Sequence, residues 1–397
     1  MRNVLGTFLA LLPLWGCADA IEEVDPDRVY GEDGTTFVLA TALTPPDALV
    51  FQEGPITWEY VGPREFPSSR EVVDVVLEED REPAPDELSD QPAQFRLEVD
   101  TARRTDELGH EWRIIDVDEE MARALFDDYV RRTAGDGGFH PEPGPEIQGD
   151  GGFRANWTEY DCTTNPLFPN TKWVFNNGTS CDLHSSSCAS QGQRGAIVDF
   201  GIGSGVMVHN RMALTAGHVA VALVTGTSTG CTMTTNSTGS GTCGTVSDIT
   251  INSSAVGNAD WGLVEFGANV GNTSTYDLAT GSDNFINNHD PRVAGFPGIE
   301  RARESTCGGS SFLEGERNVG NYHALLNREA RVDLTAGSGT SGAPYYFWNS
   351  GASRYKIFGV HSARNKNSVG NRYALGPKVP FWASTIVSDA AGMGISL

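Results

Sequence analysis

"GSGVMVHNRMALTAGHV", residues 203–219, contains two short apolar runs separated by the polar residues His209, Asn210 and Arg211. Each run has the length of a β-strand and is bounded by residues that favour turns. The same pattern recurs along the chain, in "GAIVDFG", "DWGLVEF", "RVAGFPG", "APYYFW" and "KIFGVHS". From about residue 155 onward, the main segment with helical character lies near "VPFWASTIV", residues 379–387. The pattern therefore predicts an all-β barrel or sandwich of roughly 240 residues.

The acidic charge lies almost entirely in front of this β-rich part. The 397-residue chain has a formal net charge of −24. Residues 17–150 contain 35 Asp and Glu against 11 Arg and no Lys, a net of 11 − 35 = −24, whereas residues 151–397 contain 17 against 16, a net of −1. Such a difference indicates two functional units. It also argues against a nucleic-acid partner, because phosphate contacts need Lys and Arg.

The acidic region has its own structural signals. Stretches of strand character are "TTFVLATAL", "REVVDVVLEED" and "AQFRLEVD", at residues 35–43, 70–80 and 93–100. Residues 118–132 predict a helix, with Asp118 as its N-cap and Arg131 and Arg132 in its last turn. A stripe on that helix is expected to pack in a core, and its members are Met121, Leu125 and Tyr129, with Ala122 and Phe126 beside them. The Gly/Pro-rich residues after the helix predict a linker and a boundary near residue 150.

The first residues predict export. "MRNVLGTFLALLPLWGCADA" has one early arginine, an apolar run and then small residues, as a secretory signal peptide does. "LWGC" favours a lipoprotein in which Cys17 carries the lipid, and "ADA" favours ordinary cleavage. The expected layout is a signal peptide over 1–17, an acidic region and linker over 18–150, and a β-rich domain over 151–397. The protein would then be secreted or lipid-anchored at a bacterial cell envelope, with Cys17 as its one link to a membrane.

The cysteines agree with export. Apart from Cys17, six cysteines lie in the C-terminal part, and an even number in an exported domain predicts disulfides. Local pairing favours Cys181 with Cys188 and Cys231 with Cys243, which leaves Cys162 with Cys307, although other pairings are equally compatible with the sequence. A zinc site is disfavoured, because there is no C-x-x-C pair and no His at ligand spacing. No cofactor is expected.

Three segments carry residues suited to nucleophilic catalysis. His218 follows "LTAG" at a strand end, Asp260 precedes the apolar "WGLV", and Ser341 lies in "GTSGAP". Taken alone, His218 reads as a structural histidine and Asp260 as an exposed strand cap. The order His, Asp, Ser along the chain matches the chymotrypsin-type triad and differs from those of subtilisins and α/β-hydrolases.

These segments together resemble the trypsin-like serine peptidase family, and in particular its bacterial glutamyl endopeptidase (staphylococcal-type) branch. "LTAGH", "ADWGLV", "VAGFPG", "DLTAGSGTSGAP" and "GVHS" match in order and spacing over about residues 195–385. The resemblance implies a chymotrypsin-like double β-barrel, preceded by a smaller α+β acidic pro-region. It implies Ser341 as nucleophile, His218 as general base and Asp260 as the residue that orients His218. Backbone N–H groups of Gly339 and Ser341 would form the oxyanion hole.

The same resemblance suggests cleavage after Glu or Asp. His361 matches the histidine that contacts the acidic side chain in this branch, although a histidine packed in the barrel is the competing interpretation. Ala336 stands where the branch has a hydroxyl residue, with Thr335 beside it. Two interpretations of Arg364 are open: it is a cation that compensates for the lost hydroxyl, or it is a solvated arginine in a loop. Ser338 lacks the Ser-Gly-x-Pro context of the nucleophile.

The expected partners are protein or peptide substrates and the chain's own pro-region, as an inhibitor or folding aid, in a monomer. Processing after Glu146 would indicate self-cleavage, and processing after Arg132 or Arg154 an outside activator. The alternatives are a catalytically silent binding module with a protease fold and a serine peptidase with non-acidic specificity. An esterase is disfavoured because G-x-S-x-G is absent around Ser341. "GIGSG" at 201–205 lacks the Lys of a phosphate-binding loop.

Overall fold

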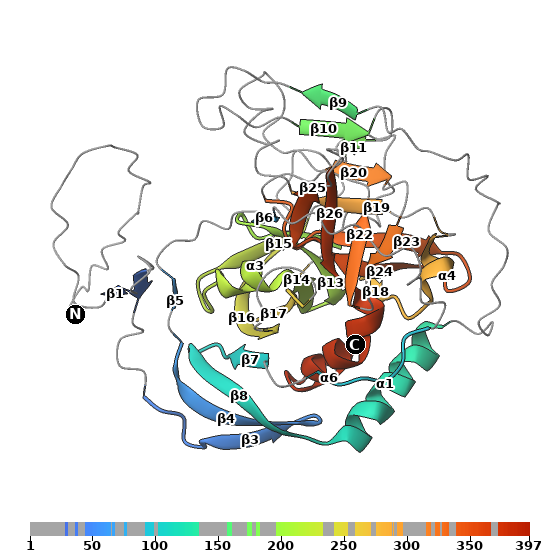
Figure 1. The fold of residues 1–397 in the computed structure, drawn as a ribbon. Helices are drawn as coiled ribbons and strands as arrows, with labels where there is room; N and C mark the ends of the chain where they lie inside the picture. The colour runs from blue at the N-terminus through green and yellow to red at the C-terminus, as the bar shows by residue number, and fades with distance from the viewer. Residues whose placement is uncertain are drawn as a thin grey trace, which may run out of the picture.

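The fold is that of a computed structural model of the full chain (Figure 1). It describes residues 28–30, 36–38, 44–64, 66–67, 75–77, 92–98, 102–134, 157–160, 173–176, 180–182, 196–232, 242–252, 259–270, 275–287, 289, 292–296, 315–318, 322–325, 328–332, 339–366 and 372–397. The predicted signal peptide, Cys17, the boundary near 150 and the processing sites Glu146 and Arg154 lie outside these residues. Among the described helices, none is long and apolar enough to cross a bilayer.

Six antiparallel strands form a closed first barrel. The sheet runs β15-β12-β13-β14-β17-β16, and a further pairing of β15 with β16 closes it. Its strands are β12 (Ile197–Asp199), β13 (Ser204–His209), β14 (Met212–Thr215), β15 (Thr229–Thr232), β16 (Cys243–Asn252) and β17 (Gly262–Phe266). The short helix α3 (Gly217–Val221) follows β14. The predicted disulfide between Cys231 and Cys243 joins β15 to β16.

A second β-unit consists mostly of strands that follow the first barrel in the chain. One of its two sheets has the order β11-β20-β19-β23-β24-β18, and the other the order β21-β22-β26-β25-β6. A bridge between Gly359 and Lys378 joins the sheets, together with a hydrogen bond from Ser362 N to Leu375 O of 2.9 Å. The strands are β11 (Ser180–Asp182), β18 (Asp277–Leu278), β19 (Arg292–Gly295), β20 (Gly315–Asn318), β21 (Tyr322–Leu325), β22 (Glu329–Val332), β23 (Pro344–Asn349), β24 (Arg354–Val360), β25 (Ala363–Lys366) and β26 (Arg372–Pro377).

These two units confirm the predicted all-β, chymotrypsin-like fold class. Two helices complete the C-terminal part, α4 (Asp283–Asn287) and α6 (Val379–Ala391), and α6 is the helix expected near residues 379–387. A two-stranded sheet of β9 (Trp157–Tyr160) and β10 (Trp173–Asn176) lies earlier in the chain. Figure 1 shows the first barrel in green and yellow beside the second unit in orange and red.

The acidic N-terminal region (residues 18–150) extends the first barrel. Strand β7 (Ala102–Thr105) pairs antiparallel with β16, so that Ile249 faces Thr105 and Asn252 faces Ala102. The sheet continues through β8 (His110–Val117), β4 (Ile56–Pro63) and β3 (Val50–Glu53). Thus a single sheet of ten strands includes residues from both of the predicted units. The remaining strands of the region are β1 (Arg28–Tyr30), β2 (Thr36–Val38), β5 (Phe66–Pro67) and β6 (Val75–Leu77).

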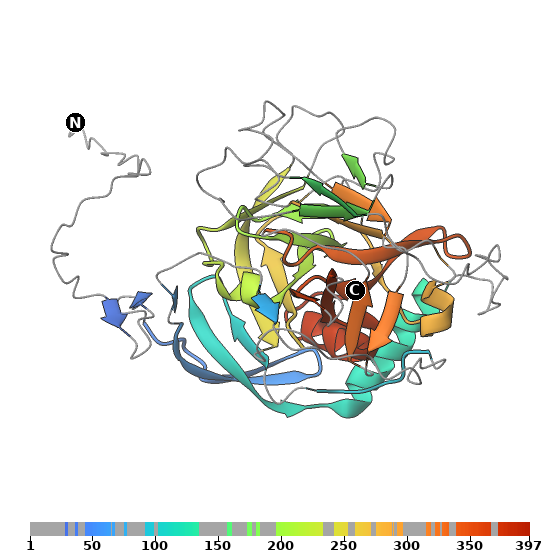
Figure 2. The ribbon, with the colours of Figure 1, turned by 45° about the horizontal axis from the view of Figure 1, so that its top comes forward.

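Helix α1 (Glu119–Thr133) packs beside α6, and Figure 2 shows α6 between α1 and the barrels. Asp118 caps it, as predicted, by accepting from Met121 N at 2.9 Å. The predicted stripe is partly wrong: Met121 is 41% exposed, and the buried face is formed by Ala122, Phe126, Tyr129 and Thr133. Phe126 and Tyr129 belong to the same apolar core as the first barrel, so the face of α1 that carries them packs against that core.

Residues 92–98 do not form the strand that "AQFRLEVD" predicts. Arg96 N donates to Ser384 Oγ at 2.9 Å, and Glu98 N donates to Thr385 Oγ1 at 3.2 Å. These backbone groups are satisfied by hydroxyls of α6 instead of by a neighbouring strand, which is why no ladder forms.

Candidate active site

His218 and Asp260 form a pair with two hydrogen bonds. Strand β14 ends at Thr215, and His218 follows it in the first turn of α3. The backbone N of His218 donates to Asp260 Oδ1 at 2.8 Å, and His218 Nδ1 lies 2.6 Å from Asp260 Oδ2. Gly217 makes this approach possible, because a Cβ there would lie 2.8 Å from Asp260 Oδ1. The carboxylate therefore fixes both the backbone and the ring of the histidine.

A hydroxyl that the sequence did not single out completes the surroundings of Asp260. Ser362 Oγ donates to Asp260 Oδ2 at 2.5 Å, and the Asp260 side chain is 2% exposed. Burial alone raises the pKa of Asp260, but the hydrogen bonds and charge of His218, together with the Ser362 hydroxyl, outweigh it and hold that pKa below its ordinary value. Asp260 is thus a carboxylate at neutral pH.

The ionised carboxylate determines the tautomer of the histidine. A carboxylate only accepts hydrogen bonds, so the proton of a neutral His218 ring lies on Nδ1 and its Nε2 carries a lone pair. Nε2 is buried and forms no hydrogen bond with any residue of the described segments. The second nitrogen of the ring is therefore available as a proton acceptor.

The loop that carries Ser341 packs against the strand that leads to His218. The carbonyl of Ser341 accepts from Ser204 N at 2.7 Å, and Gly342 N donates to His361 O at 2.8 Å. Gly342 has φ +85°, and a Cβ on it would lie 2.0 Å from Ser204 O and 2.2 Å from Thr215 Oγ1. This close contact, which only glycine permits, places the loop at the end of β14.

Gly203 marks the point where the two catalytic candidates approach each other. A Cβ on Gly203 would lie 2.7 Å from the Val219 side chain and 3.0 Å from the Ser341 carbonyl oxygen. Val219 is the residue directly after His218. The serine loop and the histidine turn therefore meet across one glycine, and Ser341 itself is fully buried in the full-length chain.

Gly339 adopts a backbone conformation that suits the predicted anion-binding loop. Its φ is +93°, which L side chains rarely adopt. Its carbonyl accepts from Ser204 Oγ at 3.1 Å, and the same hydroxyl accepts from Phe296 N at 2.8 Å. Ser204 thus braces the loop from β13. In the sequence, the "GSG" around Ser204 predicts only turns between strands, and nothing in that pattern identifies the serine as a hydrogen-bond partner of the loop.

His361 lies directly behind the serine loop. It is fully buried, its Nδ1 lies 2.8 Å from Tyr345 Oη, and its backbone N donates to Ala343 O at 2.8 Å. Arg364 lies three residues further on, in β25, where its backbone faces Ala374 of β26. The other residues named for substrate binding, Thr335 and Ala336, lie outside the described residues, as does Ser338.

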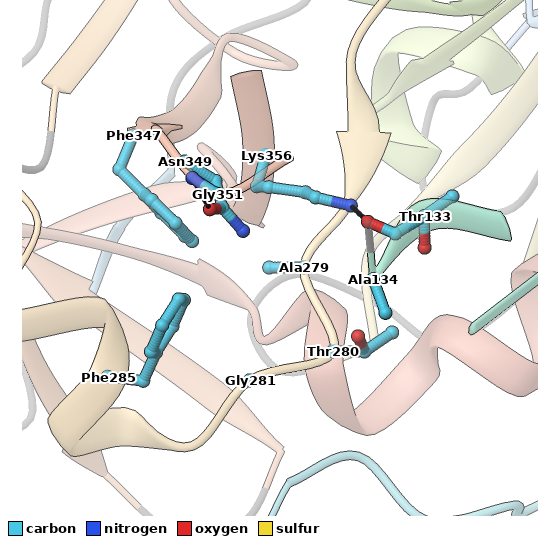
Figure 3. A pocket seen from close by; sticks show the side chains of 10 residues that line it. All are labelled: Thr133, Ala134, Ala279, Thr280, Gly281, Phe285, Phe347, Asn349, Gly351 and Lys356. Atoms are coloured by element: carbon cyan, nitrogen blue, oxygen red, sulfur yellow. Dashed lines mark hydrogen bonds between the residues drawn. The ribbon is translucent and has the colours of Figure 1, made fainter. Parts of the chain in front are cut away.

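A pocket elsewhere in the molecule has no residue of this site in its wall (Figure 3). It lies where the end of α1 meets the second β-unit, and Lys356 Nζ there donates to Thr133 O at 2.7 Å. Its lining residues are Thr133, Ala134, Ala279, Thr280, Gly281, Phe285, Phe347, Asn349, Gly351 and Lys356. The pocket therefore belongs to the junction with the N-terminal region.

Comparison with known proteins shows similarity to solved structures. No family model matches the chain, and no curated protein matches it. Among solved structures, the chain is similar to one described as "Structure of Glu endopeptidase in complex with MPD", with 20% sequence identity and a TM-score of 0.39. The alignment covers 54% of this chain and 97% of that one. A match at this level carries no information on activity or specificity.

Proposed function

We propose that the protein is a serine endopeptidase that uses Ser341, His218 and Asp260. The observation that supports this most directly is the pair of His218 and Asp260, which are joined by two hydrogen bonds beside the Ser341 loop. A buried, ionised aspartate that fixes one ring nitrogen and leaves the other for proton transfer is what a serine nucleophile needs, because a serine hydroxyl is a weak nucleophile without a base.

The proposed reaction has two stages. Ser341 Oγ attacks the scissile carbonyl carbon while His218 Nε2 takes the hydroxyl proton, and the backbone N–H groups of Gly339 and Ser341 stabilise the oxyanion. The C–N bond then breaks as His218 returns the proton to the leaving amine, which leaves an acyl-enzyme. Water, activated by the same histidine, releases the acid. Loss of one oxyanion donor is expected to raise the barrier by about 3 kcal/mol.

Labelling of the nucleophile tests the activity. A serine-directed phosphonate should label Ser341 in the processed protein, by which we mean the C-terminal part freed of its N-terminal region, and Ser341→Ala should abolish labelling and peptide cleavage. Ser338→Ala, in the same loop, is the matched control and should retain both. Asp260→Asn should lower kcat by about 10⁴-fold with the fold intact, because the ring would lose its correct tautomer. A folded, processed protein that is neither labelled nor active would leave the alternative, a silent binding module.

Specificity for acidic residues is a second, separable part of the proposal. His361, next to the serine loop, is the candidate reader of a Glu or Asp side chain, with Arg364, Thr335 and Ala336 in the matching segments. Cleavage of a diverse peptide mixture by the processed protein should occur after Glu or Asp, and His361→Gln should remove this preference. Cleavage after apolar or basic residues would show a serine peptidase with non-acidic specificity.

The proposed precursor includes an exported N-terminal region that acts as inhibitor or folding aid. Residues 102–105 continue the sheet of the first barrel, and Phe126 and Tyr129 share its core. N-terminal sequencing of the secreted protein would locate the processing site and show whether it follows Glu146, Arg132 or Arg154. Mass spectrometry of the N-terminal peptide would show whether Cys17 carries a lipid.

A further inference from the structure

Strand β25 starts at the proposed active site. Its first residue, Ala363, follows His361 and Ser362, and these two residues contact the serine loop and Asp260 respectively. The backbone of β25 therefore leads outward from the catalytic groups.

The two edges of β25 are covered by different parts of the chain. One edge pairs antiparallel with β26, where Ala363 faces Leu375. The other edge pairs in parallel with β6 of the acidic N-terminal region, and the register matches Ala363 with Val75, Arg364 with Val76 and Asn365 with Leu77. Nearly three hundred residues of sequence separate these partners, so the contact is a tertiary one.

An open strand edge is a binding site for an extended peptide. Its unpaired N–H and C=O groups can form a ladder with any chain that arrives in register. An endopeptidase must hold its substrate extended at the nucleophile. Strand β25 begins directly after Ser362, which donates to Asp260, and its outer edge, the one that does not face β26, is the edge that β6 takes. Only one strand can use that edge at a time.

We propose that β6 is an autoinhibitory strand, which occupies the outer edge of β25 and excludes the substrate peptide for as long as the N-terminal region stays bound. This inference rests on the proposed peptidase activity of the same site. The burial of Ser341 in the full-length chain agrees with a covered nucleophile.

A three-residue pairing is sufficient because β6 is tethered on both sides. Before it, the Arg64 guanidinium donates to Val221 O, in the helix that carries His218, at 2.7 Å. After it, Ala93 N donates to Thr280 O at 2.8 Å, and Arg96 N is held by Ser384. Because the chain is held to the folded protein on both sides of β6, pairing with β25 is intramolecular, and such pairing can have an effective concentration in the millimolar range.

The tethers also predict how inhibition ends. A cut between residues 134 and 196 would leave β7, α1 and the contacts of Arg64 and Arg96 in place. Cleavage of the linker alone should therefore give a nicked complex that is still inhibited. Activity should appear only when the N-terminal region dissociates or is degraded.

Proline substitution in β6 tests the occupancy. Successive residues of a strand direct their N–H groups to opposite sides, so either Val75→Pro or Val76→Pro removes a hydrogen bond to β25. Val76→Ala keeps the backbone donor and is the matched control. In a Ser341→Ala background, which prevents self-processing, hydrogen exchange at residues 363–366 should become at least about tenfold faster in one proline variant and stay unchanged in Val76→Ala.

The catalytic consequence is measured with Ser341 intact. The uncut proline variant should cleave a fluorogenic peptide at least about tenfold faster than the uncut wild type, because occupancy of the edge reduces the competent fraction of the protein. Equal rates for the active wild-type and proline variants would overturn autoinhibition and leave the peptidase standing. Self-cleavage within residues 70–80 would overturn it as well, since β6 would then be bound as a substrate. Suppose instead that the proline variant shows faster hydrogen exchange but that the protein is inactive even after the N-terminal region has been removed. The proposed peptidase activity would then be wrong, and autoinhibition would be wrong with it.

Discussion

The N-terminal region adds a strand to the C-terminal half in two places, and the two additions differ in kind. Strand β7 pairs antiparallel with β16 over four residue pairs and is backed by a buried arginine. Strand β6 pairs in parallel with β25 over three residue pairs, at the proposed active site. The difference suggests different roles for the two strands: β7 anchors the N-terminal region to the first barrel, and β6 covers the proposed active site.

Arg104 is the centre of the anchor. Its Nε donates to Asp248 Oδ2 of β16 at 2.7 Å, and its Nη1 donates to Glu53 Oε2 at 2.8 Å and to Gly392 O at 2.7 Å. It therefore joins the first barrel, the end of α6 and strand β3. Trp58 Nε1 donates to the same Gly392 carbonyl at 3.0 Å. The anchor thus combines strand pairing with charge-assisted hydrogen bonds, which are stronger than neutral ones.

The largest expected effect on stability is that of Arg104→Ala. The variant leaves Asp248 buried without its cation, and removal of one partner of a buried ion pair costs about 3–5 kcal/mol. Unfolding of the full-length Ser341→Ala protein in urea measures the loss. Burial raises the pKa of Asp248 to about 7, and Arg104 opposes that rise. The variant therefore holds a proton on Asp248 to higher pH. Above about pH 7 the wild-type carboxyl is ionised in both the folded and the unfolded protein, whereas the variant must still take up a proton on folding, so its deficit should be larger at pH 8 than at pH 5.

Arg103→Ala is the control on the same strand. Its guanidinium pairs with Glu111, its side chain is 53% exposed, and such surface pairs contribute about 0–1 kcal/mol. A loss as large as that of Arg104→Ala would show that the strand is sensitive to any substitution and that Arg104 is no special anchor. In the nicked protein, Arg104→Ala should also speed release of the N-terminal region and the appearance of activity.

Asp389 predicts a smaller, pH-dependent effect on the α6 side of the anchor. It is fully buried, both of its carboxylate oxygens make no hydrogen bond with described residues, and burial raises its pKa to about 8. Because the folded pKa is raised, the contribution of Asp389 is most favourable below about pH 4 and is lost as pH rises toward about 8. Asp389→Asn should remove this loss and stabilise the protein at pH 9 by at least about 1 kcal/mol.

Thermal unfolding across pH 4–9 checks the Asp389 variant. Asp127→Asn removes an equivalent charge from the exposed face of α1 and should leave the pH profile unchanged. If Asp389→Asn loses stability to the same extent as the wild type between pH 4 and pH 8, the carboxylate is not held in the dry environment that the raised pKa requires.

Sequence alone predicted the parts of the molecule that are encoded locally. Short apolar runs bounded by turn residues gave the strands around His218, and the helix cap at Asp118 could be read from one residue type at one position. His218 follows β14 and Asp260 precedes β17, and these two strands pair antiparallel with Thr215 facing Gly262, so the placement of both residues at one end of the first barrel follows from the fold.

The remaining features depend on partners that are distant in sequence. Ser362 contacts Asp260 across 102 residues, and nothing in "GVHS" identifies that partner. The contrast in charge indicates two functional units but not how they contact each other, and β7 joins the sheet of the first barrel because backbone pairing does not depend on net charge. Which stripe of α1 is buried was decided by α6 and the barrel core, and so Met121 became exposed.

The smallest expected effect on stability is that of the β6 proline variant that exposes β25. It removes one backbone hydrogen bond at a sheet edge and leaves β7, Arg104 and α1 in place, so the free energy of unfolding should fall by no more than about 1 kcal/mol. Urea unfolding of the Ser341→Ala background measures it beside Arg104→Ala. If β6 covers the site and β7 anchors the region, the proline variant frees the site at almost unchanged stability. Arg104→Ala, in contrast, lowers the stability and also weakens the hold of the N-terminal region on the site. A proline variant as unstable as Arg104→Ala would show that β6 is part of the anchor, and the proposed division between the two strands would be wrong.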